Sequence, residues 1–359
     1  MVAHRDNPGA LAWSWSYLSV FSPPSSKQGD VVVLSDAGRG KRVAIQRNPL
    51  LDFIADTFTG TAAHSPLMDK LADLGLINTT DCDDDKGIAQ AAHWQKRGWH
   101  QSLDYYLWSR QSRFVDRVDV TKEQRIGTIQ RYIEQDGTPP PRLVPTGQRR
   151  PLPNPTPLPK DITLGKVLME RRSIRTYVPE SVPGPILSAV LWFGLDRVRH
   201  ARRSLAADDP FTYLISYGVA FDFYLVVYGT EGLEPGVYYY DILAHNLVEI
   251  RQGKYRQEMV HDLFGTVSPN TAGWTVVLVA DFAQYIWRYR HGRALRNLYI
   301  ESGRVVNSLL LAAAACGLGT LVTPAMRDRH MSALLAVDPM RQAPIYTATM
   351  GFDRRYYKR

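Results

Sequence analysis

Apolar residues along the second half of the chain form runs of strand length rather than strict apolar–polar alternation. Such runs lie at 221–229, 236–250, 273–282 and 343–352. Runs of this length that are rich in Val, Ile, Tyr and Phe predict strands. The run at 236–250 is interrupted at Ala244 to Asn246, which predicts a hairpin turn at that point.

Helix-period patterns separate these runs. In 161–172, Leu164, Val167 and Leu168 fall on one face, and Asp161 is expected to cap the helix. A second helix is predicted over 184–198. Helices and strands are mixed without strict βαβ alternation, so the fold class is α+β with a mixed sheet flanked by helices. Neither a GxGxxG nor a GxxxxGK[ST] motif occurs.

The longest uncharged segment, Val305–Met326, has the length of a membrane span. It carries Asn307 and Ser308 near one end, and Gly317, Gly319 and Pro324 near the other. This pattern favours a helix buried on all sides in a globular core, and we expect no membrane association.

The first 80 residues predict a small module. Segment 30–48 indicates two strands around a turn with Gly38 and Gly40. Two short helices follow at 49–60 and 64–79, the second beginning at Ser65-Pro66. This order is compatible with a winged-helix-like module.

Segment 91–114 predicts a helix rich in aromatic residues. They are Trp94, Trp99, Tyr105, Tyr106 and Trp108. Two interpretations stay open: a helix that packs these rings inward, or a surface that binds a peptide or a second subunit.

Segment 138–160 contains nine of the 23 prolines. Such density excludes a helix or a central strand and favours an extended, semi-rigid linker or an arm around a neighbour. The expected division is therefore 1–137, a winged-helix-like and helical region; 138–160, the arm; and 161–359, the main domain.

Composition restricts the classes of partner and the cellular compartment. The 359 residues carry a net charge of +8, which suits nucleic acid, a phosphorylated cofactor or an acidic peptide as partner. Only Cys82 and Cys316 occur, which excludes a disulfide framework and a CxxC metal site and indicates a reducing cytoplasm. The N-terminal stretch does not resemble a signal peptide, and no metal site is expected.

The segment MERRSIRTY gathers Arg171, Arg172 and Arg175 around Ser173 at the predicted end of a helix. Guanidinium groups donate paired hydrogen bonds to phosphate oxygens, and the serine adds a hydroxyl donor. The alternative is an Arg-rich helix end with its charges in water, favoured by the helix dipole.

Downstream motifs distinguish these alternatives. ERRSIRTY, GLEPGVYYYD and GRVVNSLLLAAAACGLGT occur in the order that resembles the nitroreductase superfamily, and within it the SagB-type dehydrogenases, over about 162–359. The resemblance implies FMN as cofactor, an intertwined homodimer with FMN at its interface, and a phosphate site at Arg171, Arg172, Ser173 and Arg175.

The same resemblance implies further flavin contacts. They are Ser216 and Gly218, which match a PSxG segment; Gly319 and Ala325 in the segment after the long helix; and Arg354 and Arg355 near the C-terminus. Pro324 has no N–H, so only Ala325 can donate to flavin N5 at that place. Gly317 and Gly319 fit a left-handed helix end equally well, and the two arginines fit a solvated basic tail.

The related azoline dehydrogenases carry a Lys-Tyr pair before the long helix, and this chain has Arg288-Tyr289 there. Arginine does not act as a base. Tyr289 could do so if neighbouring guanidinium charge lowers its pKa, and His291 has the more suitable intrinsic pKa. The alternative is a basic loop that touches a partner subunit or an acidic peptide.

The resemblance therefore implies FMN-dependent oxidation of a peptide azoline to a thiazole or oxazole during natural-product maturation. The expected partners are a peptide substrate, with the N-terminal module as one candidate for its leader region, a cyclodehydratase and a second copy of the chain, without nucleic acid. Two alternatives remain: another flavin redox reaction, such as nitro or quinone reduction with NAD(P)H or desaturation of a different peptide position, and a non-catalytic flavin-binding scaffold.

Overall fold

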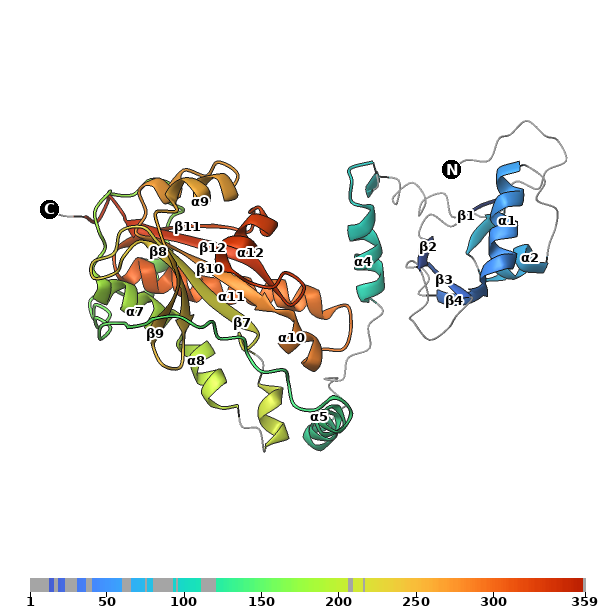
Figure 1. Cartoon of the computed structure of the whole chain (residues 1–359), viewed down its shortest axis with the longest axis horizontal. Helices are drawn as coiled ribbons and strands as arrows, with labels where there is room; N and C mark the ends of the chain where they lie inside the picture. Colours follow the sequence, from blue (N-terminus) through green and yellow to red (C-terminus); the bar gives the residue numbers. More distant parts are fainter. Residues whose placement is uncertain are drawn as a thin grey trace. The chain divides into compact units, whose positions relative to one another are not determined.

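The chain folds into two compact units, Met1–Arg113 and Phe114–Arg359 (Figure 1). The computed structural model describes residues 13–15, 19–22, 31–36, 41–59, 66–74, 76–79, 93–94, 96–110, 121–205, 209–215 and 217–357. The predicted positions Gly38, Gly40, Ser65, Cys82 and Ser216 lie outside these residues.

The first unit contains the predicted strands and helices. Its elements are β1 (Trp13–Trp15), β2 (Ser19–Ser22), β3 (Val31–Asp36), β4 (Lys41–Gln46), α1 (Arg47–Thr59), α2 (Pro66–Asp73) and β5 (Ile77–Thr79). Strands β2, β3 and β4 form one antiparallel sheet, and β1 pairs with β5 in another. The predicted helix 64–79 was thus too long, because its last residues form β5. The winged-helix identity of this module stays a prediction.

The aromatic segment forms a shorter helix than predicted, α4 (His100–Arg110). A turn with Gly98 at φ +76° precedes it. Trp94 stacks on Tyr106 with ring centroids 6.0 Å apart and meets Trp99 edge-on at 5.8 Å. Trp99 and Tyr106 nevertheless stay 58% and 40% exposed, so a binding surface here remains a prediction.

The second unit is built on a seven-stranded sheet in the order β11-β12-β10-β7-β8-β9-β6. The strands are β6 (Arg149–Pro151), β7 (Phe221–Val227), β8 (Gly236–Asp241), β9 (Asn246–Gln252), β10 (Trp274–Asp281), β11 (Leu318–Thr323) and β12 (Gln342–Phe352). All ladders between these strands are antiparallel. The α+β class is confirmed, while parallel pairing is limited to isolated bridges such as Ser173 with Thr320.

Helices complete the second unit. They are α5 (Lys122–Asp136), α6 (Leu164–Glu170), α7 (Gly184–Gly194), α8 (Asp196–Arg203), α9 (Arg256–Asp262), α10 (Phe282–Arg288), α11 (Ala294–Ala315) and α12 (Asp328–Leu335), with short 3₁₀ turns at Pro210–Leu214 and Ser268–Asn270. None of the described helices is long and apolar enough to cross a membrane.

The central strands β7 and β10 are buried on both faces, which their mostly apolar sequences allow. Along β7, Phe223 and Leu225 face a core shared with α7 and α11, whereas Tyr224 and Val226 face a core shared with α9 and α12. The unit therefore has three layers, with the sheet between two sets of helices.

Two expectations for α6 were wrong. Thr163, not Asp161, caps the helix, since its hydroxyl accepts a hydrogen bond from the Lys166 N–H at 3.2 Å. Val167 is buried, but Leu164 and Leu168 are 65% and 58% exposed. The apolar face of this helix is thus largely uncovered within one chain.

The long helix ends where the glycine-containing segment after it was expected to begin: helix α11 ends at Ala315, Gly317 turns the chain at φ +74°, and the remainder enters β11. The expectation that Val305–Met326 forms a helix buried on all sides was wrong in part, because the helix stops at Ala315 and Asn307 on it is exposed. Tyr299 and Ile300, in the first half of α11, are more than half exposed, so the whole helix is amphipathic. Gly319 lies inside β11, so Gly317 alone provides the left-handed turn.

The proline-rich segment lies along the second unit. Its strand β6 adds to the sheet edge beside β9, where proline is tolerated because one side needs no hydrogen bond. The Trp287 indole donates to the Gly137 carbonyl at 3.0 Å, and the Ser188 hydroxyl donates to the Pro153 carbonyl at 2.6 Å.

Candidate functional site

The arginine cluster lies between the end of α6 and the strand β11. The Ile174 N–H donates to the Thr320 carbonyl at 2.8 Å, and Ser173 bridges to Thr320. A Cβ on Gly319 would lie 3.0 Å from the Ile174 Cβ, so glycine permits this close approach. Ser173 and Gly319, predicted from separate motifs, are thereby brought side by side.

The arginines of this cluster differ in their partners. Arg171 is half-buried and Arg175 is exposed, and neither side chain has an ion-pair partner among the described residues. Arg172 is exposed, and its Nη1 donates to the Met169 and Arg171 carbonyls at 2.7 and 2.8 Å, which covers the end of the helix. A cavity of about 150 Å³ lies beside Arg171, Arg172 and Gly317.

The C-terminal arginines also differ. Arg354 is exposed. Arg355 contacts both oxygens of Asp353, the shorter distance being 2.6 Å, and donates to the Glu170 carbonyl at 3.2 Å. Burial alone would raise the pKa of Asp353, but hydrogen bonds from Arg355 hold it below its ordinary value. Arg355 therefore ties the C-terminal segment to the end of α6.

Gly218 and Ala325 occupy tight turns. Gly218 has φ +65°, and a Cβ there would lie 2.5 Å from the Val198 side chain. Its N–H donates to Glu301 on α11 at 2.5 Å, and burial raises the pKa of that carboxyl. The Ala325 N–H donates to the Thr323 hydroxyl at 3.0 Å. Both amides that were predicted to approach the flavin thus have partners within the chain.

Arg288, Tyr289 and His291 lie at the junction of α10 with α11. The Arg288 Nε donates to the Tyr213 carbonyl at 3.1 Å, and its Cζ lies 5.0 Å from the Tyr289 ring centroid. The rings of Tyr289 and His291 are 6.4 Å apart, edge to face. The structure brings these three candidate residues together.

Arg288 and Tyr289 line a cavity of about 410 Å³. The rest of its wall includes Pro139 to Pro141 of the proline-rich segment, and Tyr213, Tyr285 and Trp287. Such a lining is mostly apolar with a few polar groups, as in pockets that bind small molecules or side chains.

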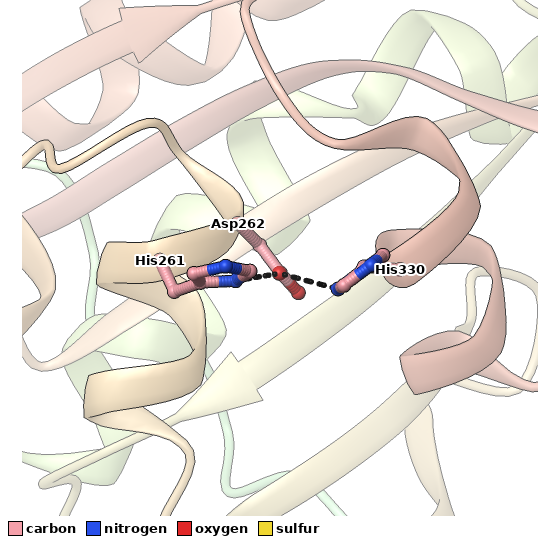
Figure 2. A group of neighbouring side chains, drawn as sticks. All are labelled: His261, Asp262 and His330. Carbon is pink, nitrogen blue, oxygen red and sulfur yellow. Dashed lines mark hydrogen bonds and ion pairs between the residues drawn. The ribbon is translucent and has the colours of Figure 1, made fainter.

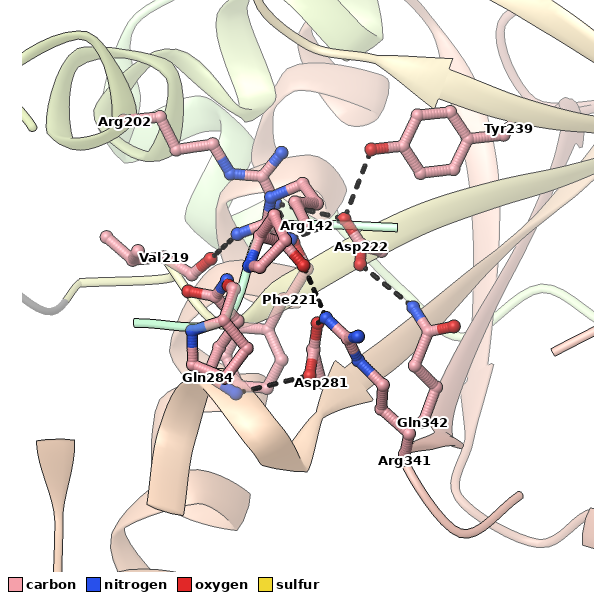
Figure 3. Close-up of polar contacts among 12 residues, drawn as sticks. Arg142, Arg202, Val219, Phe221, Asp222, Tyr239, Asp281, Gln284, Arg341 and Gln342 are labelled. Carbon is pink, nitrogen blue, oxygen red and sulfur yellow. Dashed lines mark hydrogen bonds and ion pairs between the residues drawn. The ribbon is translucent and has the colours of Figure 1, made fainter. Parts of the chain in front are cut away.

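A buried polar network forms one side of this cavity (Figure 3). Arg142 donates to Asp222 on β7 at 2.5 Å, and Arg202 contacts the same oxygen at 3.4 Å. The Gln342 side chain donates to the other oxygen at 3.2 Å. Asp222 is fully buried, so its charge depends on these partners.

The network shifts the pKa of its two guanidinium groups in opposite directions. Burial and then the charge of Arg142 lower the pKa of Arg202 to about 10. Burial is the largest single influence on Arg142 and acts to lower its pKa, but the charge and hydrogen bond of Asp222, together with smaller contributions from Tyr239 and Asp281, raise the pKa on balance. Sequence analysis missed this network, although Asp222 is the single charge in the strand FDFYLVV and Arg142 is a charge within the proline-rich segment.

The two groups of candidate residues lie at opposite ends of α11. Ala314 and Gly317 adjoin the cavity at Arg171, whereas Tyr289 precedes the first turn. The 22 residues of α11 span about 33 Å. Within one chain, the arginine cluster and Tyr289 are therefore separate sites.

The arginine cluster suits a phosphate-bearing cofactor. Among the described residues Arg171 and Arg175 have no counter-ion, and Ser173 is exposed between them. The close contact at Gly319 lets the backbone approach without a side chain in between. Phosphate is bound by charged side chains that donate paired hydrogen bonds to its oxygens, and this cluster offers such donors.

The chain is similar to known proteins over about half of its length. The chain is 29% identical over 199 residues to the trifolitoxin operon protein TfxC of Rhizobium leguminosarum bv. trifolii, covering 51% of this chain and 54% of TfxC. It therefore spans about half the length of that relative. It is 26% identical over 198 residues to a protein of Methanocaldococcus jannaschii that carries a nitroreductase name, covering 54% of this chain and 92% of that protein.

Solved structures give weaker matches. A nitroreductase-named protein from Anabaena variabilis matches with 25% identity and a TM-score of 0.48, covering 58% of this chain and 42% of the other. The Escherichia coli microcin synthetase McbBCD complex with truncated pro-MccB17 bound matches with 14% identity and a TM-score of 0.41, covering 74% of this chain and 97% of the other.

The nitroreductase family model matches residues 168–352, more than half of the chain. This range begins just before the arginine cluster and ends with β12, so it contains the seven-stranded sheet except β6. The chain belongs to the nitroreductase family, a family of flavin-dependent oxidoreductases.

Proposed function

We propose that this protein is an FMN-dependent dehydrogenase that oxidises an azoline in a ribosomal peptide to a thiazole or oxazole. The observation that carries the proposal is the arrangement of Arg288 and Tyr289 side by side in a cavity of about 410 Å³. An arginine and a tyrosine stand here where SagB-type dehydrogenases carry lysine and tyrosine. The likeness to a protein of the trifolitoxin operon gives independent support.

The cofactor site of this proposal is the arginine cluster. Arg171 and Arg175 bind the phosphate, Ser173 adds a hydroxyl donor, and Gly319 leaves the backbone of β11 open to the ligand. Arg354 is a further phosphate contact, whereas Arg172 and Arg355 chiefly hold the helix end and the C-terminal segment in place. Bound FMN would supply the hydride acceptor.

The residues just before α11 carry out the proton transfer. Tyr289 accepts the proton from the Cα of the azoline. Arg288 cannot act as a base; its Nε is anchored on Tyr213, so its charge is held next to the tyrosine ring. His291 is the second candidate for the base, because its ring lies within 6.4 Å of the Tyr289 ring.

A complete site in this proposal needs two copies of the chain. Tyr289 and the arginine cluster are separated by the length of α11, about 33 Å. The exposed apolar residues Leu164 and Leu168 on α6 and Ile300 on α11 provide a surface for a second subunit. We infer a homodimer in which Tyr289 of one subunit faces a flavin held by the arginines of the other.

Further parts of the proposal concern the rest of the chain. The first unit is a candidate for holding the leader region of the peptide, with the exposed Trp99 and Tyr106 as contact residues. A cyclodehydratase is the expected source of the azoline, and the expected compartment is the cytoplasm. In this division of the chain, the region 1–137 recognises the peptide and the domain 161–359 oxidises it, with the proline-rich arm at 138–160 between them in sequence.

A second candidate is an NAD(P)H-dependent nitro or quinone reductase. It is favoured by the nitroreductase-named relative, of which the match covers 92%. The two functions differ in the direction of hydride flow with respect to the flavin.

One experiment separates them. Purified protein is given an azoline peptide under oxygen, and loss of two hydrogen atoms per ring is followed by mass spectrometry. In parallel, flavin absorbance is followed after anaerobic addition of NADH or NADPH. The proposal expects peptide oxidation; bleaching by NAD(P)H without peptide oxidation would support the reductase, and bound flavin with neither reaction would support a scaffold.

A further inference from the structure

A cluster of two histidines and an aspartate joins α9 to α12 (Figure 2). His261 and Asp262 form the end of α9, and His330 lies in α12, 68 residues later in the chain. The Nδ1 atoms of His261 and His330 lie 3.0 and 3.5 Å from the same oxygen of Asp262. Both imidazoles therefore converge on one carboxylate.

The carboxylate of Asp262 is 4% exposed, while the two imidazole side chains are 55% and 58% exposed. Among the described residues, the two imidazoles are its only polar partners. A buried carboxylate ordinarily needs a cation or several donors, and here its second oxygen has no partner among those residues.

The backbone holds this cluster independently of the imidazoles. The Arg327 N–H donates to the Asp262 carbonyl at 2.8 Å, and the Arg327 Nε donates to the His261 carbonyl at 3.2 Å. The two helices are thus fixed beside each other before any ligand binds. The guanidinium of Arg327 is directed to the backbone and the Phe264 ring, not to the carboxylate.

Two of the three spacings between the donor atoms match those of a divalent metal site. All lie within 4.8 Å of one another. Zinc binds imidazole nitrogen and carboxylate oxygen at about 2.0–2.2 Å in tetrahedral geometry, so its ligands are about 3.3 Å apart. The distances of 3.0 and 3.5 Å bracket that value.

The space around the cluster leaves room for a further ligand to a bound metal ion. A hollow of about 530 Å³ lies over the cluster and is bordered by Glu258 and Arg329. Glu258 and Asp262 bring two negative charges, while Arg329 at the border and Arg327 beside the cluster bring two positive ones, so a cation would be held by the donor atoms rather than by net charge. Glu258 lies one turn before Asp262 on α9 and can supply a fourth ligand, or water can.

We propose that His261, Asp262 and His330 bind a divalent transition-metal ion, with Zn²⁺ the best match to a donor set of two imidazoles and a carboxylate. The ion would clamp α9 to α12 and thereby stabilise the segment that enters α12 from β11. This site lies on the face of the sheet opposite α11 and does not depend on the proposed peptide oxidation. No sequence motif indicates this site, because the two histidines are 69 residues apart and no ligand spacing links them.

The test uses the full chain freed of metal with EDTA. Wild type is titrated with ZnCl₂ by calorimetry and with CoCl₂ by visible absorption, where a four-coordinate cobalt site has bands at longer wavelength than flavin. We expect one ion per chain with micromolar or tighter affinity, and a rise in melting temperature on the order of 5 °C at saturating zinc.

The variants His261→Ala and His330→Ala remove exposed side chains and should fold, and each should weaken zinc binding at least about 100-fold. Asp262→Asn keeps the buried shape and should have the same effect. His200→Ala, an exposed histidine on α8, is the matched control and should bind zinc as wild type does. The proposal is overturned if wild type takes up no zinc at micromolar concentration, or if His330→Ala binds it as tightly as the control.

Discussion

At the scale of single residues, Arg171 and Arg175 differ from the other arginines around them because their side chains have no partner among the described residues. Replacing both by alanine should lower FMN affinity by about 3 kcal/mol, roughly 10²-fold, the cost of losing charged hydrogen bonds to a phosphate. Fluorescence quenching of FMN by flavin-free protein measures this loss. Arg203→Ala, an exposed arginine on α8, should leave the affinity unchanged; a double variant that binds FMN as tightly would show that the phosphate lies elsewhere.

Tyr289 and Arg288 carry the second prediction at this scale. Tyr289→Phe removes only a hydroxyl, so FMN should stay bound while peptide oxidation slows about 10²-fold or more, the usual effect of losing a general base. Arg288→Lys restores the pair of the SagB-type enzymes and should keep or raise the rate. If Tyr289→Phe oxidises the peptide at the wild-type rate, the base is another group, and His291→Ala is then the decisive variant.

At the scale of elements, the β8–β9 hairpin is closed by a buried polar contact. His245 has φ 51° and bonds to the Ser188 hydroxyl at 2.8 Å and the Tyr240 hydroxyl at 2.7 Å. Burial and then the charge of Arg199 lower its pKa to about 4, from an ordinary value of 6.5. The neutral ring is therefore favoured in the folded state.

The sign of the pH effect follows from that lowered pKa. The contribution of His245 to stability is fully present above pH 6.5 and is lost as the pH falls toward 4. Denaturant unfolding at pH 7.5 and 4.5 should show that wild type loses about 1 kcal/mol more than His245→Asn, which tolerates the same backbone angle. Equal losses in the two proteins would mean that His245 does not resist protonation.

The proline-rich arm is the second element with a distinct energetic role. Arg142 joins it to the buried Asp222, whereas Arg149 in the same arm pairs with Asp241 while 56% exposed. Arg142→Met should lower the free energy of unfolding by about 3 kcal/mol, because a buried charge loses its closest partner. Arg149→Met should cost under about 1 kcal/mol. Similar losses in urea denaturation for both variants would contradict a special role of the buried pair.

At the scale of the whole molecule, a site shared between two subunits predicts how a dimer of two different variants behaves. At an FMN concentration that saturates wild type but lies far below the Kd of the double variant Arg171→Ala, Arg175→Ala, both this variant and Tyr289→Phe should be at least about ten-fold less active than wild type. After the two are unfolded and refolded together, half of the dimers are mixed, and each mixed dimer has one intact site, so about a quarter of wild-type activity should return. If both groups act within one subunit, no intact site forms and no activity returns.

Features that depend on contacts between residues close together in the chain can be predicted from the sequence, whereas features that depend on contacts between distant residues cannot. The strands β3, β4, β7, β8, β9, β10 and β12, the hairpin turn at His245 and the start of α2 at Pro66 follow from local apolar runs and turn residues, and the structure confirms them. Local pattern misjudged α6, because whether Leu164 and Leu168 are buried depends on which surface lies opposite, and that surface is remote in the sequence.

The sequence by itself determined the α+β class, the family, the position of the arginine cluster and the extended proline-rich arm, since these depend on residue type and short spacing. Only the tertiary structure decided that Ser173 lies against Thr320, that Arg142 reaches Asp222 and that His261 meets His330. Each of these pairs joins residues far apart in the chain, and their contact is set by sheet order and helix packing. The same packing places Tyr289 and Arg171 at opposite ends of α11, which no local pattern indicates.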